Sequence, residues 1–374
     1  MSTSKSMRLA AQAIGRNSIK VVAVSAGGKT FRDKDINGDI KVTDELFSVY
    51  REIDSGKSPL KSFQNLIGRL ARLVDELKIK IDIINELKEI GDETLQSSSP
   101  DFLVSRGEYL YAKIFAAFIG YEFVDSAEII KFDNDGNLNV EFSEFLIREK
   151  YREADCFVTG GFYGSDANGK IRLFSRGGGD VTGAILARAL NAEVYENYTD
   201  VDGVLPVPPD ILKKIGANKR FSKPLKELSF RQMEILTDFS VNVLHPDVLV
   251  LLDKSGIPVK ILNTFNKYSS GTTISEGITD SNEFLFAVEK SETIKKAIRK
   301  KQNRIKLYRM LLNYYKQTPG NDRYAVYLSN SEESVIKSKM ISSSFNVEVF
   351  SSREGNVLII DNVGLNSVCK FLTE

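Results

Sequence analysis

Three consecutive glycines that open onto an apolar helix constrain the fold of this chain more than any other feature. Gly177-Gly178-Gly179 follows Phe174-Ser175-Arg176 and leads into the apolar segment 181–190. Glycines leave backbone N–H groups unshielded, and a helix N-terminus favours anions through its free N–H groups and its dipole. The next apolar strand ends in a second polar turn, Thr199-Asp200-Val201-Asp202-Gly203-Val204. Two such turns around one helix, with the cation of Arg176, predict a phosphate or nucleotide site; a purely conformational glycine turn is the alternative.

The composition excludes several classes of function. With 51 basic and 50 acidic residues the net charge is +1, so we expect neither nucleic acid nor a membrane surface as a partner. His245 is the single histidine, which argues against a histidine metal site and a Ser-His-Asp relay, and we expect it to be structural. No apolar run approaches the length of a membrane span. The two cysteines, Cys156 and Cys369, lie far apart in sequence and fit a reducing cytoplasm, so we expect a cytoplasmic protein.

Short apolar strands alternate with helical segments along the first three quarters of the chain. This alternation predicts an α/β fold with a mainly parallel sheet that helices cover on both faces. We also expect a charged loop at 31–40, a helix N-cap at Asp101, two short strands within 122–139 around the turn 133–137, and a hairpin that turns at 166–169. The predicted strands are 20–25, 156–159, 193–198 and 259–262, and the predicted helices are 2–14, 41–90, 101–118, 181–190 and 229–237.

The composition changes after Gly277, so a chain of 374 residues is expected to form two domains, 1–280 and 281–374. The second part contains a long basic helix, 294–315, whose charges we interpret as a solvated face because no aromatic platform accompanies them. Its predicted strands are 284–288, 324–328, 347–350 and 357–360.

The order of the motifs resembles aspartokinase, a family within the amino-acid kinase fold. The turn at 199–204 is typical of the wider superfamily, and Lys41-Val42-Thr43-Asp44 resembles aspartokinases of low-GC Gram-positive bacteria. The resemblance implies a three-layer αβα sandwich with a mainly parallel sheet, followed by a small C-terminal α+β domain of the ACT-like type that makes a homodimer. Four stretches resemble aspartokinase in particular: 104–108, 175–180, 243–246 and 257–272.

The same resemblance implies transfer of the γ-phosphoryl group of ATP to the side-chain carboxylate of L-aspartate, the entry step to lysine, threonine and methionine synthesis. ATP and Mg²⁺ are the implied cofactors, with the metal ion held through the nucleotide and not by protein ligands. A carboxylate is already a nucleophile at neutral pH, so no general base is needed. The chemistry requires cations and N–H groups around the phosphoryl group, and the alignment of two anions.

Carried over by resemblance, Arg176, Gly27 and Gly28 are the catalytic residues, and Arg176 also pairs with a substrate carboxylate. Glu108 is expected to bind the substrate ammonium, with a surface or capping carboxylate as the alternative. Thr43 is expected to contact the substrate, with a helix N-cap as the alternative, and Asp202 fits a turn-shaping role equally well. The remaining expected residues are Gly179 and Asp180 for the substrate, and Ser25, Gly177, Gly178, Thr199, Asp200, Asp202 and Gly203 for ATP.

The sequence also departs from the family pattern. The family has a strand and a Lys-Phe-Gly-Gly-type loop before the helix that resembles 2–14, so we expect either a start upstream of Met1 or a catalytically impaired relative that binds ligand or pairs with an intact subunit. Gly179 stands where a serine is usual, and Asp210 where an arginine is usual. A kinase of another small amino acid or carboxylate is the third hypothesis.

Overall fold

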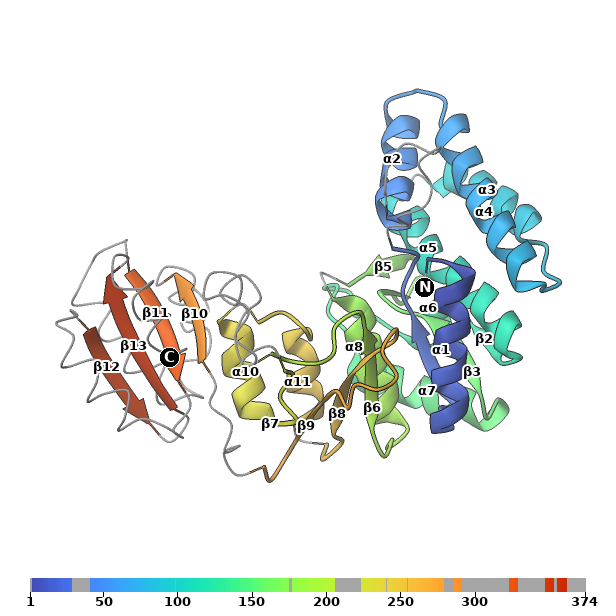
Figure 1. Ribbon diagram of the computed structural model, residues 1–374. Helices are drawn as coiled ribbons and strands as arrows, with labels where there is room; N and C mark the ends of the chain where they lie inside the picture. Colours follow the sequence, from blue (N-terminus) through green and yellow to red (C-terminus); the bar gives the residue numbers. More distant parts are fainter. Residues whose placement is uncertain are drawn as a thin grey trace. The chain divides into compact units, whose positions relative to one another are not determined.

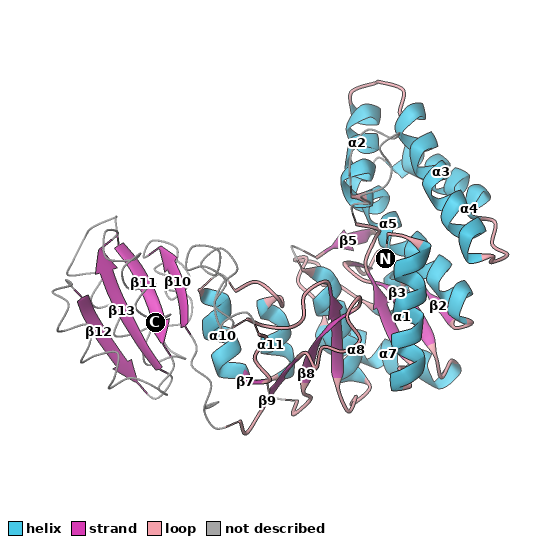
Figure 2. Cartoon of the chain, in the orientation of Figure 1, coloured by secondary structure: helices cyan, strands magenta, loops and turns pink. Residues whose placement is uncertain are grey.

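The computed structural model divides the chain into two compact units, residues 1–195 and 196–374, which are considered separately below. Figure 1 traces the helices and strands along the chain, and Figure 2 shows them by type. The predicted loop at 31–40, the basic helix at 294–315, Arg176, Asp210 and Cys369 lie outside the described residues. The structure describes residues 2–28, 41–97, 99–174, 177–205, 223–239, 241–253, 255–278, 286–290, 323–328, 347–352 and 355–361.

A parallel sheet forms the centre of the first unit. Its strand order is β1-β3-β2, with β1 at Val21–Val24, β2 at Glu122–Val124 and β3 at Phe157–Gly160. β3 is buried along its whole length, as expected for a central parallel strand. Val24 pairs with Gly160, so β1 and β3 end at the same edge of the sheet. The strands predicted at 20–25 and 156–159 are therefore confirmed.

One helix, Pro100–Ile119, packs against all three strands, and other helices pack on it and on one another. The predicted helical region 41–90 is confirmed but divides into three, since turns at Ser55 and Lys78 end the first two helices. α5 contains more buried residues than the other helices described in this unit, and it begins at Pro100 after an N-cap at Ser99. The prediction of Asp101 as the N-cap was wrong, because proline fits the first helical position and Asp101 lies in the first turn. The helices are α1 (Ser4–Asn17), α2 (Val42–Asp54), α3 (Leu60–Leu77), α4 (Ile83–Ser97), α5 (Pro100–Ile119), α6 (Ser126–Ile129), α7 (Val140–Glu153) and α8 (Gly178–Ala189).

The region 122–139 differs in part from its prediction. β2 ends early, because the Asp125 side chain accepts a hydrogen bond from Ala127 N–H and caps the short helix α6. Across the turn 133–137 the expected strand pair is reduced to one antiparallel bridge between Phe132 and Leu138. The hairpin predicted at 166–169 is confirmed: β4 (Tyr163–Ser165) pairs antiparallel with β5 (Ile171–Leu173).

The second unit contains a mixed sheet of order β6-β8-β9-β7. β7 and β9 run parallel, whereas β8 and β9 are antiparallel, so the parallel pattern is not continuous here. The predicted helix at 229–237 is confirmed, and a capping box formed by Ser229 and Gln232 begins it. The elements are β6 (Tyr195–Thr199), β7 (Glu227–Ser229), α10 (Phe230–Asp238), α11 (Pro246–Leu252), β8 (Val259–Asn263) and β9 (Thr272–Ser275).

A separate antiparallel sheet lies beyond residue 280. Its order is β10-β11-β13-β12, and the four strands predicted from the sequence are all present. Residues 357–360 of β13 are buried one after another, so both faces of this strand are covered. Within the described residues, no helix is both long and apolar enough to cross a membrane. The strands are β10 (Phe286–Lys290), β11 (Arg323–Leu328), β12 (Val347–Ser352) and β13 (Gly355–Asp361).

Candidate active site

The predicted site residues of the first unit gather where β1 and β3 end. Ser25 to Gly28 continue from β1, and Gly161 follows β3 and donates its N–H to Val24 O at 2.8 Å. In parallel α/β sheets, ligands bind beyond the carboxyl ends of the strands. The position of these turns therefore fits a binding site, although Gly161 was not among the residues predicted for it.

The glycine triplet packs closely against these turns. A Cβ at Gly161 would lie 2.8 Å from the Gly179 Cα, and a Cβ at Gly178 would lie 2.5 Å from the Phe174 Cβ. Only glycine fits such contacts without a backbone shift. Gly179 lies beside Ser25, since a Cβ there would come 3.1 Å from the Ser25 Oγ. The structure thus brings together Ser25 and the triplet, as the sequence predicts.

Gly177 and Asp180 define the start of α8. Gly177 is the N-cap in a left-handed conformation (φ 75°), and no side chain caps the helix. The first N–H groups of a helix have no intrahelical acceptor, so an uncapped start offers them to a ligand. Asp180 lies in the first turn, where its backbone carbonyl accepts a hydrogen bond from the Tyr195 hydroxyl at 3.2 Å.

Glu108 projects from α5 beneath the β1 turn. It is 5% exposed, and burial raises the pKa of its carboxyl to about 7, although hydrogen bonds from backbone N–H groups, that of Ala26 among them, act in the opposite direction. Its Oε2 has no hydrogen-bond partner within the described part of the chain. The alternative of a surface or capping carboxylate was wrong, because Glu108 is buried in the middle of its helix. A buried acid with an unmatched oxygen fits an ammonium ligand.

Thr43 lies in the first turn of α2, next to the same turn of β1. The N-cap of α2 is Lys41, so the alternative of Thr43 as an N-cap was wrong. Val42 N–H donates to Gly27 O at 3.0 Å and so joins α2 to the turn. Gly107 permits this approach, because a Cβ there would come 3.1 Å from the Ala26 Cβ.

No role was predicted for Arg106, a buried cation two residues before Glu108 in α5. Arg106 is 5% exposed, and its guanidinium lies over the rings of Tyr109 at 4.5 Å and Tyr163 at 5.2 Å. It is 3.8 Å from Asp125, which accepts a hydrogen bond from the Tyr163 hydroxyl at 2.7 Å. These contacts hold α5 against β4 and thereby help to fix the position of Glu108 on α5.

The second unit carries the other predicted nucleotide residues. Asp202 Oδ1 accepts hydrogen bonds from the side-chain amides of Asn263 and Asn266, at 2.8 and 2.9 Å, and so shapes its loop. Thr199 O accepts from Thr264 N–H, and the Thr199 hydroxyl donates to exposed Asp200.

Gly203 and His245 have local roles in the second unit. Gly203 has φ 136°, and a Cβ there would lie 2.6 Å from the Thr272 Oγ1, so glycine is required. His245 is the N-cap of α11 and accepts a hydrogen bond from Asp247 N–H at 3.3 Å, which agrees with its predicted structural role.

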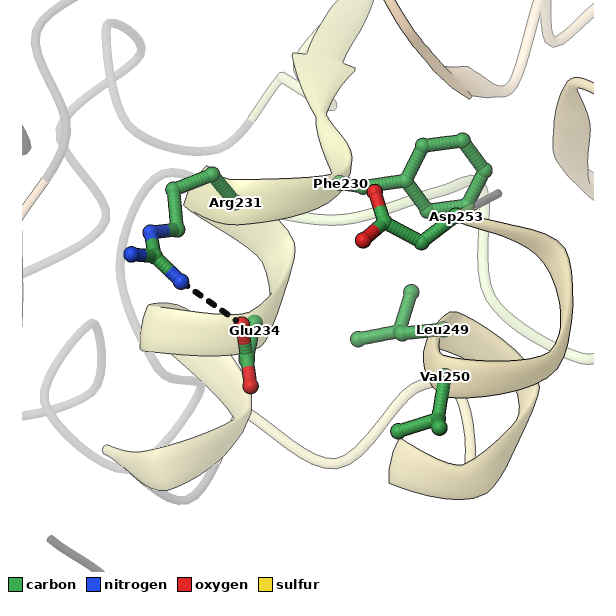
Figure 3. Close-up of a pocket in the computed structure, with 6 residues that line it drawn as sticks. All are labelled: Phe230, Arg231, Glu234, Leu249, Val250 and Asp253. Carbon is green, nitrogen blue, oxygen red and sulfur yellow. Dashed lines mark hydrogen bonds and ion pairs between the residues drawn. The ribbon is translucent and has the colours of Figure 1, made fainter. Parts of the chain in front are cut away.

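A pocket of about 190 Å³ lies between α10 and α11 (Figure 3). Arg231 and Glu234 form an ion pair at 3.2 Å on one side of it. None of the residues predicted for catalysis or binding lines this pocket, so it is separate from the candidate site. Its lining consists of Phe230, Arg231, Glu234, Leu249, Val250 and Asp253.

Comparison with known proteins identifies the family. The sequence profile of the Amino acid kinase family matches residues 1–263. The chain belongs to the amino acid kinase family. Aspartokinase 3 of Bacillus subtilis (strain 168) is 31% identical over 269 residues, which cover 68% of this chain and 57% of that protein. The aspartokinase of Rickettsia prowazekii (strain Madrid E) is 26% identical over 218 residues, 56% of this chain and 46% of that protein. The chain thus spans about half the length of these curated relatives.

Solved structures of the same family support the fold. The crystal structure of Clostridium acetobutylicum aspartate kinase matches with a TM-score of 0.80 and 25% identity, over 100% of this chain and 96% of that chain. E. coli aspartokinase III in complex with aspartate and ADP matches with a TM-score of 0.69 over 99% and 96% of the two chains. At 16% identity the latter likeness concerns the fold alone. The α/β fold expected from the motif order is thereby confirmed.

Proposed function

We propose that this chain catalyses transfer of the γ-phosphoryl group of ATP to the side-chain carboxylate of L-aspartate. The observation that carries the proposal is the buried Glu108, which has an unmatched Oε2 and accepts a hydrogen bond from Ala26 in the turn after β1. The glycine start of α8 lies against the same turn, since Gly179 is beside Ser25. The buried carboxylate can accept an amino-acid ammonium, and the helix start can accept a phosphate chain. The similarity to aspartokinases supports aspartate as the amino acid.

In this proposal the residues divide between the two reactants. Glu108 binds the substrate ammonium, and Thr43 with Gly179 and Asp180 contacts the rest of aspartate. Arg176, which precedes the glycine triplet in sequence, pairs with a substrate carboxylate and offsets the charge of the phosphoryl group.

The nucleotide is held by N–H groups and by the second polar turn. The uncapped start of α8 fits an anion, and Gly178 packs too closely against Phe174 and Phe162 to carry a side chain. Mg²⁺ enters with the phosphates of ATP and supplies charge neutralisation when bound. Ser25, Gly27, Gly28, Gly177 and Gly178 line the phosphate channel, and Thr199, Asp200, Asp202 and Gly203 hold the remainder of the nucleotide.

The C-terminal part is proposed to be one ACT-like domain, with a domain boundary near residue 280. β11 and β12 are both antiparallel to β13, so they run parallel to each other with β13 between them, as in a split βαβ unit. We further propose that this domain makes a homodimer and that the protein acts in the cytoplasm in lysine and threonine synthesis.

A coupled assay of ADP release tests the function. Measured with aspartate, with glutamate and with buffer alone, the chain is expected to release ADP only with aspartate. Faster turnover with glutamate would instead support a kinase of another amino acid. Binding of ADP without turnover would support a catalytically impaired relative.

The role of Arg176 has its own test. Arg176→Ala is expected to raise the aspartate KM far more than the ATP KM, because the guanidinium pairs with the amino acid. Arg152→Ala, which removes an exposed cation of α7, is the matched control and should change neither. Equal effects of Arg176→Ala on both KM values would contradict the assignment.

A further inference from the structure

A basic side chain of α3 reaches the turn that the proposed function assigns to the phosphate channel. Arg69 Nη2 donates to Gly28 O at 2.6 Å. Its Nη1 lies 3.9 Å from the Glu45 Oε2 on α2, and the two side chains are only 12% and 14% exposed. One guanidinium therefore contacts both the last described residue after β1 and the first turns of α2, which are the two ends of the segment 29–40.

The two ends are also joined directly, by the bond from Val42 N–H to Gly27 O. The C=O and N–H of one trans peptide unit point in opposite directions. This bond therefore turns Gly28 N–H away from α2. Together with the bond from Arg69, it fixes two successive peptide groups of the glycine turn.

α5 packs against the same turn. The Tyr111 side chain is fully buried, and a Cβ at Gly27 would lie 2.2 Å from its hydroxyl oxygen. Burial raises the pKa of Tyr111, while the adjacent Arg69 guanidinium acts to lower it. Glu108, one helical turn before Tyr111, accepts a hydrogen bond from Ala26 N–H. Three side chains therefore contact the turn: the phenol and the carboxylate come from α5, and the guanidinium comes from α3.

The geometry favours a positioning role over a simple ion pair. At 3.9 Å, Arg69 and Glu45 are too far apart for a hydrogen bond. Burial raises the pKa of Glu45 despite the nearby cation. Arg69 instead donates a hydrogen bond to Gly28 O, in the turn assigned to the phosphate channel.

We propose that Arg69 is a positioning residue that clamps the Ser25–Gly28 turn to the first turn of α2. It thereby fixes the phosphate channel and Thr43 relative to each other, although the segment 29–40 separates them in sequence. This inference rests on the proposed function for its catalytic consequence, but the clamp itself is independent of it. An arginine donates to Gly28 O through one guanidinium nitrogen and keeps another beside Glu45, whereas the single ammonium of a lysine reaches Gly28 O alone.

Amide hydrogen exchange of the protein without ligands tests the clamp. In Arg69→Gln we expect exchange of peptides covering 21–28 and 42–46 to become about tenfold faster, since the bond to Gly28 O is lost and opening is easier. Arg69→Lys should show a smaller increase. Arg72→Gln removes another arginine of α3, one that donates to Gly68 O in its own helix, and should leave both peptides unchanged. Unchanged exchange in Arg69→Gln would overturn the proposal, whatever the activity.

Kinetics test the catalytic consequence with the same variants. Misplacement of reacting groups by about 1 Å costs on the order of 100-fold in rate. We therefore expect kcat of Arg69→Gln to fall 10- to 100-fold, with a smaller fall in Arg69→Lys. In Arg72→Gln, kcat and the KM values should equal those of the unaltered chain. Faster exchange with unchanged kcat would refute the role in positioning the site. If the unaltered chain itself shows no turnover with aspartate or glutamate, the proposed function fails, while hydrogen exchange still decides the clamp.

Discussion

Replacing Glu108 by glutamine isolates the charge of the buried carboxylate, because the two side chains have nearly the same shape. Burial raises the pKa of this carboxyl from 4.5 to about 7. The folded state therefore holds a proton that the unfolded state releases at lower pH. The stability associated with this proton is fully present below pH 4.5 and is lost as the pH rises through 7.

The magnitude follows from the two pKa values. Each tenfold change in proton affinity corresponds to about 1.4 kcal/mol, so the raised pKa of Glu108 lowers the free energy of unfolding by about 3 kcal/mol at pH 8 and by about 1 kcal/mol at pH 5.5, relative to low pH. A buried glutamine amide brings its own cost at either pH. That cost cancels when the two pH values are compared. The effect of Glu108→Gln on the free energy of unfolding should thus be about 2 kcal/mol more favourable at pH 8 than at pH 5.5.

Urea denaturation followed by far-ultraviolet circular dichroism measures this difference in the first unfolding transition. Glu93→Gln, an exposed position on α4, is the control and should give the same change at both pH values. An equal effect of Glu108→Gln at pH 5.5 and pH 8 would show that the carboxyl titrates as if it were in water. The assigned burial would then be incorrect.

The same titration predicts how the substrate binds. If the ammonium of aspartate pairs with ionised Glu108, affinity should rise roughly tenfold between pH 6 and pH 8 as the carboxyl loses its proton. Glu108→Gln should bind aspartate weakly with little dependence on pH in this range. Titration calorimetry in the presence of ADP measures both quantities. A pH profile of the variant that matches that of the unaltered chain would argue against the ammonium contact.

Three substitutions test the packing of the fold. Gly161→Ala should destabilise the protein by about 1–3 kcal/mol and lower activity, since its Cβ would lie 2.8 Å from the Gly179 Cα; a melting temperature equal to that of the unaltered chain would contradict the close approach. Gly68→Ala is its control, because nothing lies within 4 Å of that Cβ inside α3, and a gain of about 0.5–1 kcal/mol is expected from helix propensity. Ser229→Ala removes one half of the capping box with Gln232 and should cost about 1 kcal/mol in chemical denaturation; no loss would mean that the cap adds nothing.

Local patterns in the sequence predicted the elements around the site. The apolar run that becomes β1, the hairpin at 166–169 and the helix that follows Arg176, which begins within the glycine triplet and earlier than the predicted 181–190, each depend on neighbours a few residues apart. Asp101 was misassigned for the same reason, since a proline one residue earlier already begins the helix. Ser25 lies beside Gly179 because Gly161, which follows β3, packs on Gly179 next to the end of β1.

The residues that support the site were not predictable in this way. Arg69 and Gly28 are 41 residues apart, and an arginine on an amphipathic helix gives no local sign that it faces inward. Arg106 is enclosed partly by Tyr163, a residue from another element of the fold. Such contacts depend on which helix faces which strand, and this is settled only by tertiary packing.

The order of strands in the C-terminal sheet has a practical consequence for dissecting the protein. β10 supplies the backbone partner of one side of β11, although residues 291–322 separate the two strands in sequence. A fragment that starts after Lys290 would leave the N–H and C=O groups of β11 open to solvent. Open strand edges recruit other chains and promote aggregation. A recombinant C-terminal fragment should therefore begin before Phe286 if it is to stay monodisperse.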